Sequence, residues 1–427
     1  MFIYHNKFNF IKTNYLNLLI SSLPLTLIIG NLATNINIVL ICIFGVWKFG
    51  KEIFLTKSKE NYLIYLFFLY LIIVTFFNNF LNINKNDLYL DHLLKSFYFL
   101  RYLIMFLVIS KLIEKNEFNT NIFFISCAFF SFIVAVDIVI QVIFKINIFG
   151  YPIQYNRPTS FFKGELIAGG YLQKFILFFI LVISIKKKFK SLKLIIILSI
   201  IFLIPIILTG NRMPTILYMI SILLILILEK KFKNLIFVFV ILSFIILLFT
   251  NFGPNKRLQT DFKVFFLNSI NIINTAPKLF IYNKLDNEYV WHTGYLIQFN
   301  SGVQQWKQNK FFGRGLKSFR INCSYAKYQT CSTHPHNYFI ELMLDMGLFG
   351  ALLIYLVFFI GSKNFFQIYL KEKNLNFRLT SIVFFILIFL EFFPIRSSGS
   401  FFTTNNATFL FLTLAIFLNV KKIQKLE

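Results

Sequence analysis

The chain has 427 residues, of which 57% are hydrophobic and only 14% are charged. Soluble domains usually carry about 25% charged residues, so this composition excludes a disordered basic tail and an ordinary soluble globule. The formal net charge of +26 is compatible with a nucleic-acid partner, because basic proteins neutralise phosphates. The positions of the charges decide that question.

Runs of about 20 apolar residues, long enough to span a bilayer, recur along the whole chain. We therefore expect an all-α, polytopic membrane protein with about 12 transmembrane helices. No cleavable signal pattern stands at the first run, so it is expected to remain as a helix. The expected spans lie near residues 15–31, 34–49, 61–80, 94–112, 121–144, 165–185, 192–209, 213–229, 233–250, 338–361, 379–395 and 404–420.

These spans divide the chain into three parts. Residues 1–250 hold spans one to nine, residues 251–337 form one large polar loop, and residues 338–427 hold the last three spans and a tail. In the sequence, the large loop is the only segment long enough to form a lid or a small subdomain outside the membrane.

Lys and Arg are distributed unevenly between the two sets of short connections. Of the 43 Lys and Arg residues, 23 fall in one set together with both terminal segments, and seven fall in the alternate set. Cytoplasmic connections carry the excess of these residues, whereas long loops translocate regardless of their charge. We therefore expect both termini in the cytoplasm, the large loop on the outer face, and no nucleic-acid partner.

Three of the seven cations in the short outer connections are Arg, although most cations of the chain are Lys. Arg157, Arg212 and Arg396 each stand near the end of an expected span. Arg presents a planar, always-charged fork that suits phosphate. Two interpretations remain open: the three residues bind one anionic ligand, or each contacts lipid headgroups.

The large loop ends in His334-Pro335-His336-Asn337, which runs directly into the tenth span. Proline keeps His334 extended and can begin the helix that carries His336. An imidazole here could take a proton from a sugar hydroxyl near neutral pH, and the structural alternative is a hydrogen bond that fixes the loop. Two histidines are too few ligands for a metal site, so we expect neither a metal nor another cofactor.

Charged residues inside spans are costly and usually face a cavity or a partner. Glu341 and Asp345 follow the histidines at about one-turn spacing and could orient an imidazole or pair with Arg. We expect structural pairing within the bundle for four others, namely Arg101, Asp137, Lys174 and Glu391.

Two cysteines, Cys323 and Cys331, lie in the large loop with seven residues between them. If the loop lies in an oxidising compartment, a disulfide that closes this short segment is plausible. Such a bond would hold the chain in place just before the two histidines.

Several of these residues resemble the signature of bacterial O-antigen ligases and the related O-antigen polymerases. The sharpest match is His336-Asn337, followed by Gly347 and Gly350, at the junction of a large outer loop and a span. The less specific matches are residues 312–319, which include Arg314, and residues 210–212, 157–170 and 393–400.

The resemblance implies a metal-independent, inverting glycosyl transfer on the periplasmic face of the bacterial inner membrane. The donor would be a glycan on undecaprenyl pyrophosphate. The acceptor would be lipid A–core for a ligase, or the next lipid-linked repeat for a polymerase, in the synthesis of lipopolysaccharide or another surface polysaccharide.

The resemblance also implies roles for individual residues. His336 would activate the acceptor hydroxyl and Arg212 would bind the pyrophosphate. Further pyrophosphate candidates are Arg157, Arg314 and Arg396, and supporting residues are His334, Asn337, Glu341, Gly347 and Gly350. His292 stands where another loop Arg is expected, which leaves the second phosphate-binding cation open.

Two alternative functions remain open from the sequence. Asp286 and Glu288 could ligate a divalent ion in a metal-dependent glycosyltransferase, although Asp286-Asn287-Glu288 also reads as a solvated turn. Many spans with scattered internal charges also fit a secondary transporter or a flippase for lipid-linked glycans.

Overall fold

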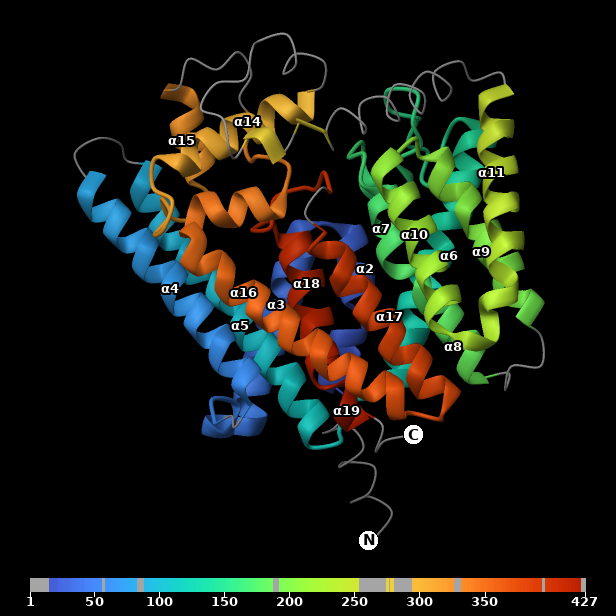
Figure 1. Ribbon diagram of the computed structural model, residues 1–427, viewed down its shortest axis with the longest axis horizontal. Coiled ribbons are helices and arrows are strands. Elements are labelled where there is room, and N and C mark those ends of the chain that lie inside the picture. The colour runs from blue at the N-terminus through green and yellow to red at the C-terminus, as the bar shows by residue number, and fades with distance from the viewer. Residues whose placement is uncertain are drawn as a thin grey trace, which may run out of the picture.

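The computed structural model describes residues 15–55, 58–82, 88–186, 192–252, 274–275, 277–279, 294–325, 332–393 and 396–423. Each of the twelve expected apolar runs forms helix (Figure 1). Apart from two isolated bridges, Ile146 with Pro152 and Gln154 with Arg157, these residues contain no β-structure. The prediction of an all-α, polytopic membrane protein is therefore confirmed.

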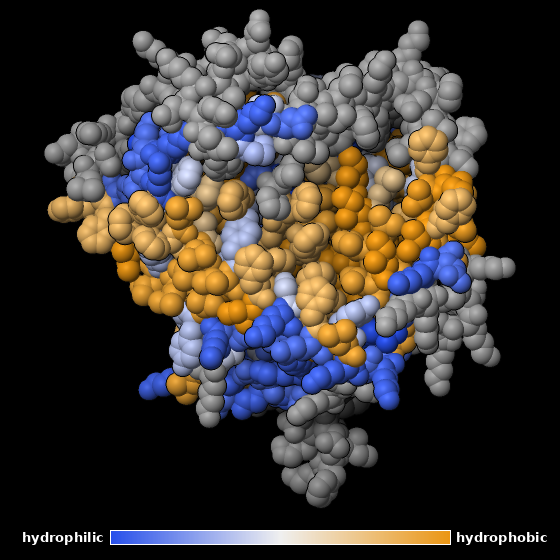
Figure 2. All heavy atoms as spheres, viewed as in Figure 1, coloured by the Kyte–Doolittle hydropathy of each residue, from blue (hydrophilic) through white to orange (hydrophobic). Residues whose placement is uncertain are grey.

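Five helical segments are long and apolar enough to cross a membrane by length and composition alone. They are Asn31–Ile53, Lys59–Phe80, Asp91–Glu114, Thr120–Phe144 and Tyr338–Lys371. Other apolar helices, such as Arg212–Leu228 and Thr404–Leu418, are shorter. Figure 2 shows an apolar band across the middle of the molecule between hydrophilic regions at its two ends, as expected of a bundle surrounded by lipid.

The helices form two groups that meet at the centre of the bundle (Figure 1). One group, from the first third of the chain, contains α2 (Leu23–Ile29), α3 (Asn31–Phe49), η1 (Gly50–Ile53), α4 (Lys59–Asn82) and α5 (Leu88–Glu114). The second group contains α6 (Thr120–Phe144), η2 (Ser160–Phe162), α7 (Ala168–Phe175), α8 (Leu177–Lys186), α9 (Leu192–Leu208), α10 (Arg212–Leu228), η3 (Lys230–Leu235) and α11 (Ile236–Phe252).

The last helices join the two groups. They are α16 (Tyr338–Lys371), α17 (Leu375–Glu391), α18 (Thr404–Leu418) and α19 (Val420–Ile423). α16 packs along α4, α18 packs along α5, and α17 contacts α10. An aromatic core fills the contact between α4, α5 and α18, where the rings of Phe68, Phe99 and Phe411 lie 5.2–6.0 Å apart.

Two helices of the large loop, α14 (Gly294–Lys307) and α15 (Ser318–Tyr325), cover one end of the bundle (Figure 1). We call this the loop end, and α19 lies at the opposite end. Gly302 allows α14 to approach the start of α16 closely, because a Cβ there would lie 2.6 Å from Ile340 and 2.9 Å from Pro335. α14 therefore packs directly on the start of α16 and on the turn between the two histidines.

α16 contains a sharp kink at Gly347, where φ is +66° and ψ is −174°. At the kink, backbone N–H groups lose their carbonyl acceptors within the helix, and carbonyls of the chain that follows α14 take their place. The N–H of Leu348 donates to the Lys310 carbonyl at 2.9 Å, and that of Phe349 donates to the Phe311 carbonyl at 3.3 Å. Gly347 therefore serves as the point where the large loop is attached to the membrane helix.

Asp345, one turn after Glu341, fixes the same attachment. Its buried carboxylate accepts hydrogen bonds from the N–H of Lys317 at 2.8 Å and from the N–H of Ser318 at 3.1 Å. It also accepts from the Ser318 hydroxyl at 2.8 Å. A carboxylate at this position stabilises the N-terminus of α15. Asp345 thus contacts the backbone of the loop rather than a histidine or an arginine.

We predict that Gly347→Ala severely destabilises the protein. A left-handed backbone costs a non-glycine residue about 1–2 kcal/mol, and the added Cβ would also lie 2.1 Å from the Phe311 carbonyl oxygen. Gly50→Ala is the matched control, because Gly50 also has a positive φ (+54°) but has nothing within 4 Å of the added Cβ. Melting temperatures in detergent measure the difference. Equal losses in the two variants would contradict the proposed attachment.

Candidate active site

A cavity of about 690 Å³ lies beside the start of α16. Its walls come from residues 157–175, 210–217 and 396–409, together with both histidines and the end of α2. It brings together five residues predicted from the sequence: Arg157, Arg212, His334, His336 and Arg396. Segments far apart in the chain therefore form one site.

The starts of three helices face this cavity. The first turns of α7, α10 and α18 contribute Gly170, Arg212 and Asn406 to its wall, among others. Free backbone N–H groups and the helix dipole favour anions at such positions. The geometry of the backbone and the charge of the side chains therefore favour the same kind of ligand.

The Gly210-Asn211-Arg212 segment shapes one wall of the cavity. Gly210 has a φ of +67°, and a Cβ there would lie 3.2 Å from Arg157 Nε, so glycine leaves room for the Arg157 side chain. The Asn211 side-chain amide donates to the Leu166 carbonyl at 3.1 Å, which holds the start of α10 against the chain leading into α7. This arrangement places Arg157 and Arg212 on the same wall.

A buried ion cluster lies next to this wall. One oxygen of Glu391 is 2.9 Å from the Arg396 guanidinium and 3.5 Å from Lys174 Nζ. Lys174 Nζ also donates to Asn406 at 3.1 Å and lies 4.7 Å from the centre of the Phe409 ring. Arg396 donates to the Leu390 carbonyl and lies over the Tyr338 ring. One carboxylate therefore supports two cavity cations.

Expected pairing inside the bundle is confirmed for Lys174 and Glu391. Arg101 instead donates to the Tyr98 carbonyl and to neutral side chains. Asp137 accepts from the Ser160 hydroxyl at 2.6 Å and from the Ile148 N–H at 2.9 Å. These hydrogen-bond partners of Arg101 and Asp137 are polar groups without charge, which also compensate a buried charge.

The two histidines lie side by side, with ring centroids 4.2 Å apart. His334 Nδ1 is 3.0 Å from the Thr333 hydroxyl, while its buried Nε2 has no hydrogen-bond partner within the described part of the chain. The His336 carbonyl accepts from the Ser398 N–H at 2.8 Å. Both rings therefore line the cavity at the point where the loop meets the bundle.

The expectation that proline starts a helix containing His336 is wrong. His336 has a φ of +57°, and α16 begins only at Tyr338. The reason is Asn337, which is extended and caps the helix by accepting from the Ile340 N–H at 3.0 Å. His336 thus sits in a tight turn before the helix.

Burial lowers the pKa of both imidazoles because it disfavours their charged forms. The pKa of His334 falls to about 4, with further contributions from His336 and Lys317. The pKa of His336 also falls below its ordinary 6.5. Both rings are therefore neutral at pH 7, and a neutral imidazole can act as a base.

The first turn of α16 also fixes the opposite wall of the cavity. The Asn337 amide donates to the Arg396 carbonyl at 2.9 Å. Glu341 accepts from the Ser400 hydroxyl and, at 2.6 Å, from the Phe401 N–H. Glu341 therefore positions the 396–401 segment through these hydrogen bonds. Gly350 lies further along α16, packed against Met346 and Tyr70.

Some predicted residues lie elsewhere. Arg314 does not line the cavity, and its N–H donates to the Leu344 carbonyl at 3.0 Å. The Cys323 side chain, Cys331, Asp286, Glu288 and His292 lie outside the described residues. Within the described residues, no group of three or more His, Cys, Asp and Glu side chains could hold a metal ion.

Lys174 is a cavity cation whose position was not predicted. The run 165–185 reads as one span, but it forms two helices, α7 and α8, which meet at Ile176. Gln173 and Lys174 lie in the last turn of α7 and line the cavity. A lysine within an apolar run was the available signal, but the sequence did not specify the face of the bundle toward which it points.

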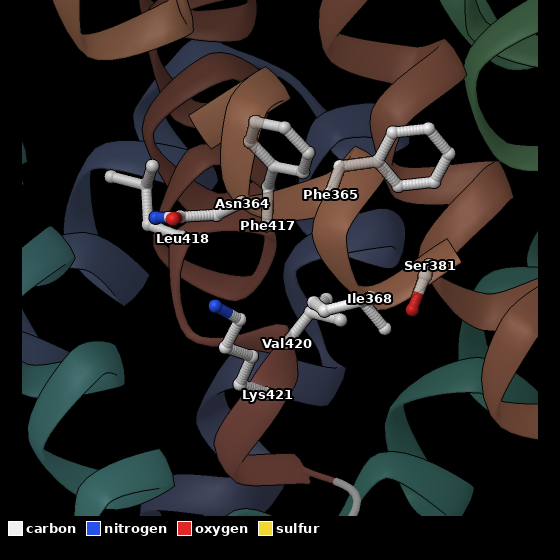
Figure 3. A pocket seen from close by; sticks show the side chains of 8 residues that line it. All are labelled: Asn364, Phe365, Ile368, Ser381, Phe417, Leu418, Val420 and Lys421. Atoms are coloured by element: carbon white, nitrogen blue, oxygen red, sulfur yellow. The ribbon is translucent and has the colours of Figure 1, made fainter. Parts of the chain in front are cut away.

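A second pocket, near α19, is much smaller than this cavity. Figure 3 shows it between α16, α17 and the end of α18, with Lys421 at its edge. Its volume of about 10 Å³ has room for about one water molecule. Of these two pockets, only the one beside the histidines could accommodate a sugar or a diphosphate.

Comparison with protein families gives one match, to the family described as O-antigen ligase (Wzy_C), over residues 194–355. The matched segment includes α9, α10, α14, α15 and the first half of α16, and thus Arg212, His334 and His336. No curated protein matches the chain. The match supports the assignment to the O-antigen ligase and polymerase family that the motifs indicated.

We predict that Glu391→Gln destabilises the protein by about 3–5 kcal/mol, because removal of the shared carboxylate leaves two buried cations uncompensated. Asp91→Asn is the control, since Asp91 and its partner Lys95 have side chains 64% and 49% exposed. An exposed pair of this kind contributes about 0–1 kcal/mol. Thermal unfolding in detergent tests both, and a Glu391→Gln variant as stable as Asp91→Asn would contradict the prediction.

Proposed function

Starting from this family assignment, we propose that the chain is an O-antigen ligase-like glycosyltransferase of the bacterial inner membrane. It transfers a glycan from undecaprenyl pyrophosphate to a hydroxyl of lipid A–core. The observation that carries the proposal is the presence of four cations and two neutral histidines around one cavity. The Lys and Arg distribution supports a periplasmic loop end and cytoplasmic termini.

In this mechanism the cations bind the donor pyrophosphate. Arg157 and Arg212 contact it together with Lys174 and Arg396, which Glu391 holds in place. Preorganised positive charge stabilises the negative charge that develops on a departing pyrophosphate. Four fixed cations can supply this stabilisation in place of a divalent metal ion.

His336 acts as the general base. As the acceptor oxygen attacks the anomeric carbon, its proton passes to an imidazole nitrogen of His336. The bond from the anomeric carbon to the pyrophosphate oxygen breaks at the same time, and its electron pair leaves with the pyrophosphate. Attack opposite the leaving group inverts the anomeric configuration.

An O-antigen polymerase is the second candidate, because it shares the family assignment and needs the same cations and base. The two functions differ in the acceptor. Deletion of the encoding gene followed by electrophoresis of surface glycans separates them. Lipid-linked polymer together with bare core indicates a ligase, and single repeats attached to core indicate a polymerase. Transport of unmodified lipid-linked glycan by the purified protein in vesicles would refute both.

We predict that His336→Ala lowers the rate of glycan transfer by about 10²–10⁴-fold, the range for loss of a general base. His336→Asn is the structural control, because Asn tolerates the left-handed backbone of this position. Both variants should insert into the membrane normally and both should fail in transfer. Wild-type glycan profiles from either variant would contradict the assignment of the base.

We predict that Arg212→Ala and Lys174→Met each lower transfer by about 10²-fold or more, because each removes one pyrophosphate-binding cation. Lys174→Met should still fold, since Arg396 continues to compensate Glu391. The control is Lys163→Ala, an exposed lysine that does not line the cavity. Transfer assays with and without a chelator measure these effects and the independence from metal.

We predict that transfer by the wild type is constant between about pH 7 and 8 and is lost on acidification. The active form of His336 is unprotonated, and burial lowers its pKa below 6.5, so protonation begins only below that pH. A pH–rate profile of kcat/KM tests this. An acid limb with a midpoint above 6.5 would contradict it.

A further inference from the structure

Two aromatic side chains are unusually exposed in the turn between α14 and α15. Phe311 is 57% exposed and Phe312 is 61% exposed. Lys310 precedes them and is exposed as well. A turn outside a membrane bundle normally presents polar residues to water, so a pair of exposed phenylalanines calls for an apolar surrounding.

The exposed pair is continuous with the lipid-facing surface of α16. The ring of Phe349 lies 6.1 Å from that of Phe311 and 5.7 Å from that of Phe312, and it is itself 49% exposed. Leu348 and Leu352 beside it are 40% and 54% exposed. α16 is one of the helices long and apolar enough to cross a membrane. The aromatic pair therefore extends the apolar band rather than forming a separate patch.

The backbone carbonyls of this turn are all hydrogen-bonded within the protein, which suits an apolar environment. The carbonyls of Lys310 and Phe311 accept from the N–H groups of Leu348 and Phe349, respectively. The Phe312 carbonyl accepts from the Tyr70 hydroxyl. Asn309 and Gly313 bond to each other, because the Asn309 carbonyl accepts from the Gly313 N–H and the Gly313 carbonyl accepts from the Asn309 side-chain amide. The Lys310 carbonyl also accepts from the Trp306 indole at 3.0 Å. Irregular backbone next to lipid needs its polar groups satisfied within the protein, and the five carbonyls of this turn meet that requirement.

The cations next to the aromatic pair fit the membrane surface. Lys307 and Lys310 lie within five residues of Phe312, and partial burial, followed by the nearby charge of Lys310, lowers the pKa of Lys307. Aromatic rings and lysines together are typical of the boundary between acyl chains and headgroups, where the amine reaches lipid phosphate.

We propose that the 309–313 turn is a membrane anchor of the large loop, in which Phe311 and Phe312 insert among the phospholipid acyl chains at the loop end. The occupant of this surface is phospholipid. The turn is hydrogen-bonded to the kink of α16, and this helix begins two residues after His336, so the anchor fixes the depth of the base relative to the bilayer. The anchor does not depend on the reaction that the site catalyses.

The test places the photoreactive residue p-benzoylphenylalanine at Phe312 in the otherwise unaltered full chain. The protein is reconstituted in nanodiscs of phosphatidylethanolamine and phosphatidylglycerol, irradiated, and examined by intact-protein mass spectrometry. Leu352, exposed on α16, is the lipid-facing control, and Arg320, exposed on α15, is the aqueous control.

We expect phospholipid adducts at positions 312 and 352 and none at 320. Position 311 provides a second probe if the first variant gives little folded protein. Absence of a lipid adduct at both 311 and 312, while Leu352 is labelled, would overturn the proposal. A cross-link from 312 to a second copy of the chain would also overturn it, because the surface would then be a protein interface.

Discussion

The candidate site depends on one buried carboxylate. Glu391 is held between Lys174 of α7 and Arg396 of the segment before α18, and it is 1% exposed. A lone cation in the interior of a membrane bundle is costly, so the shared carboxylate stabilises both cations at this depth. By sharing its charge, Glu391 keeps two cations at the cavity and joins three separate parts of the chain. The remaining walls are arranged around this cluster through Asn211, Asn337 and Glu341.

The second constraint is the backbone contact between the large loop and α16. Gly313 and Gly347 approach so closely that a side chain on either would meet the other's backbone at 2.4–2.6 Å. Asp345 adds charge-assisted bonds to the same contact. The carbonyls of the 309–313 turn all accept hydrogen bonds within the protein, and several of these bonds hold the turn against α16 and α4. In the proposed function, the candidates for recognising the glycan are polar groups of the cavity wall, such as Ser398 and Asn405.

Much of the architecture could be predicted from the sequence, because apolar runs of membrane length have few alternatives in a bilayer. His336, Arg157 and Arg212 were identifiable because they stand at the ends of spans, and the ends at one side of a bundle lie close together. The left-handed turn at His336 was missed because the capping role of Asn337 competes with the helix-starting tendency of Pro335. Lys174 was missed because a position within a span does not reveal its direction, and Arg314 was misplaced because its neighbouring glycines serve the contact with α16. Tertiary packing decided each of these cases.

The charges around the cavity have a consequence for the choice of donor. Arg157, Arg212, Lys174 and Arg396 face it, and the nearby carboxylates are Glu165 and Glu391. With both histidines neutral, the cations exceed the carboxylates by two. A pyrophosphate that links a lipid to a sugar carries two negative charges. In the proposed function, the charge count thus favours a diphosphate carrier over a monophosphate carrier or a neutral glycolipid, before any sugar has been recognised.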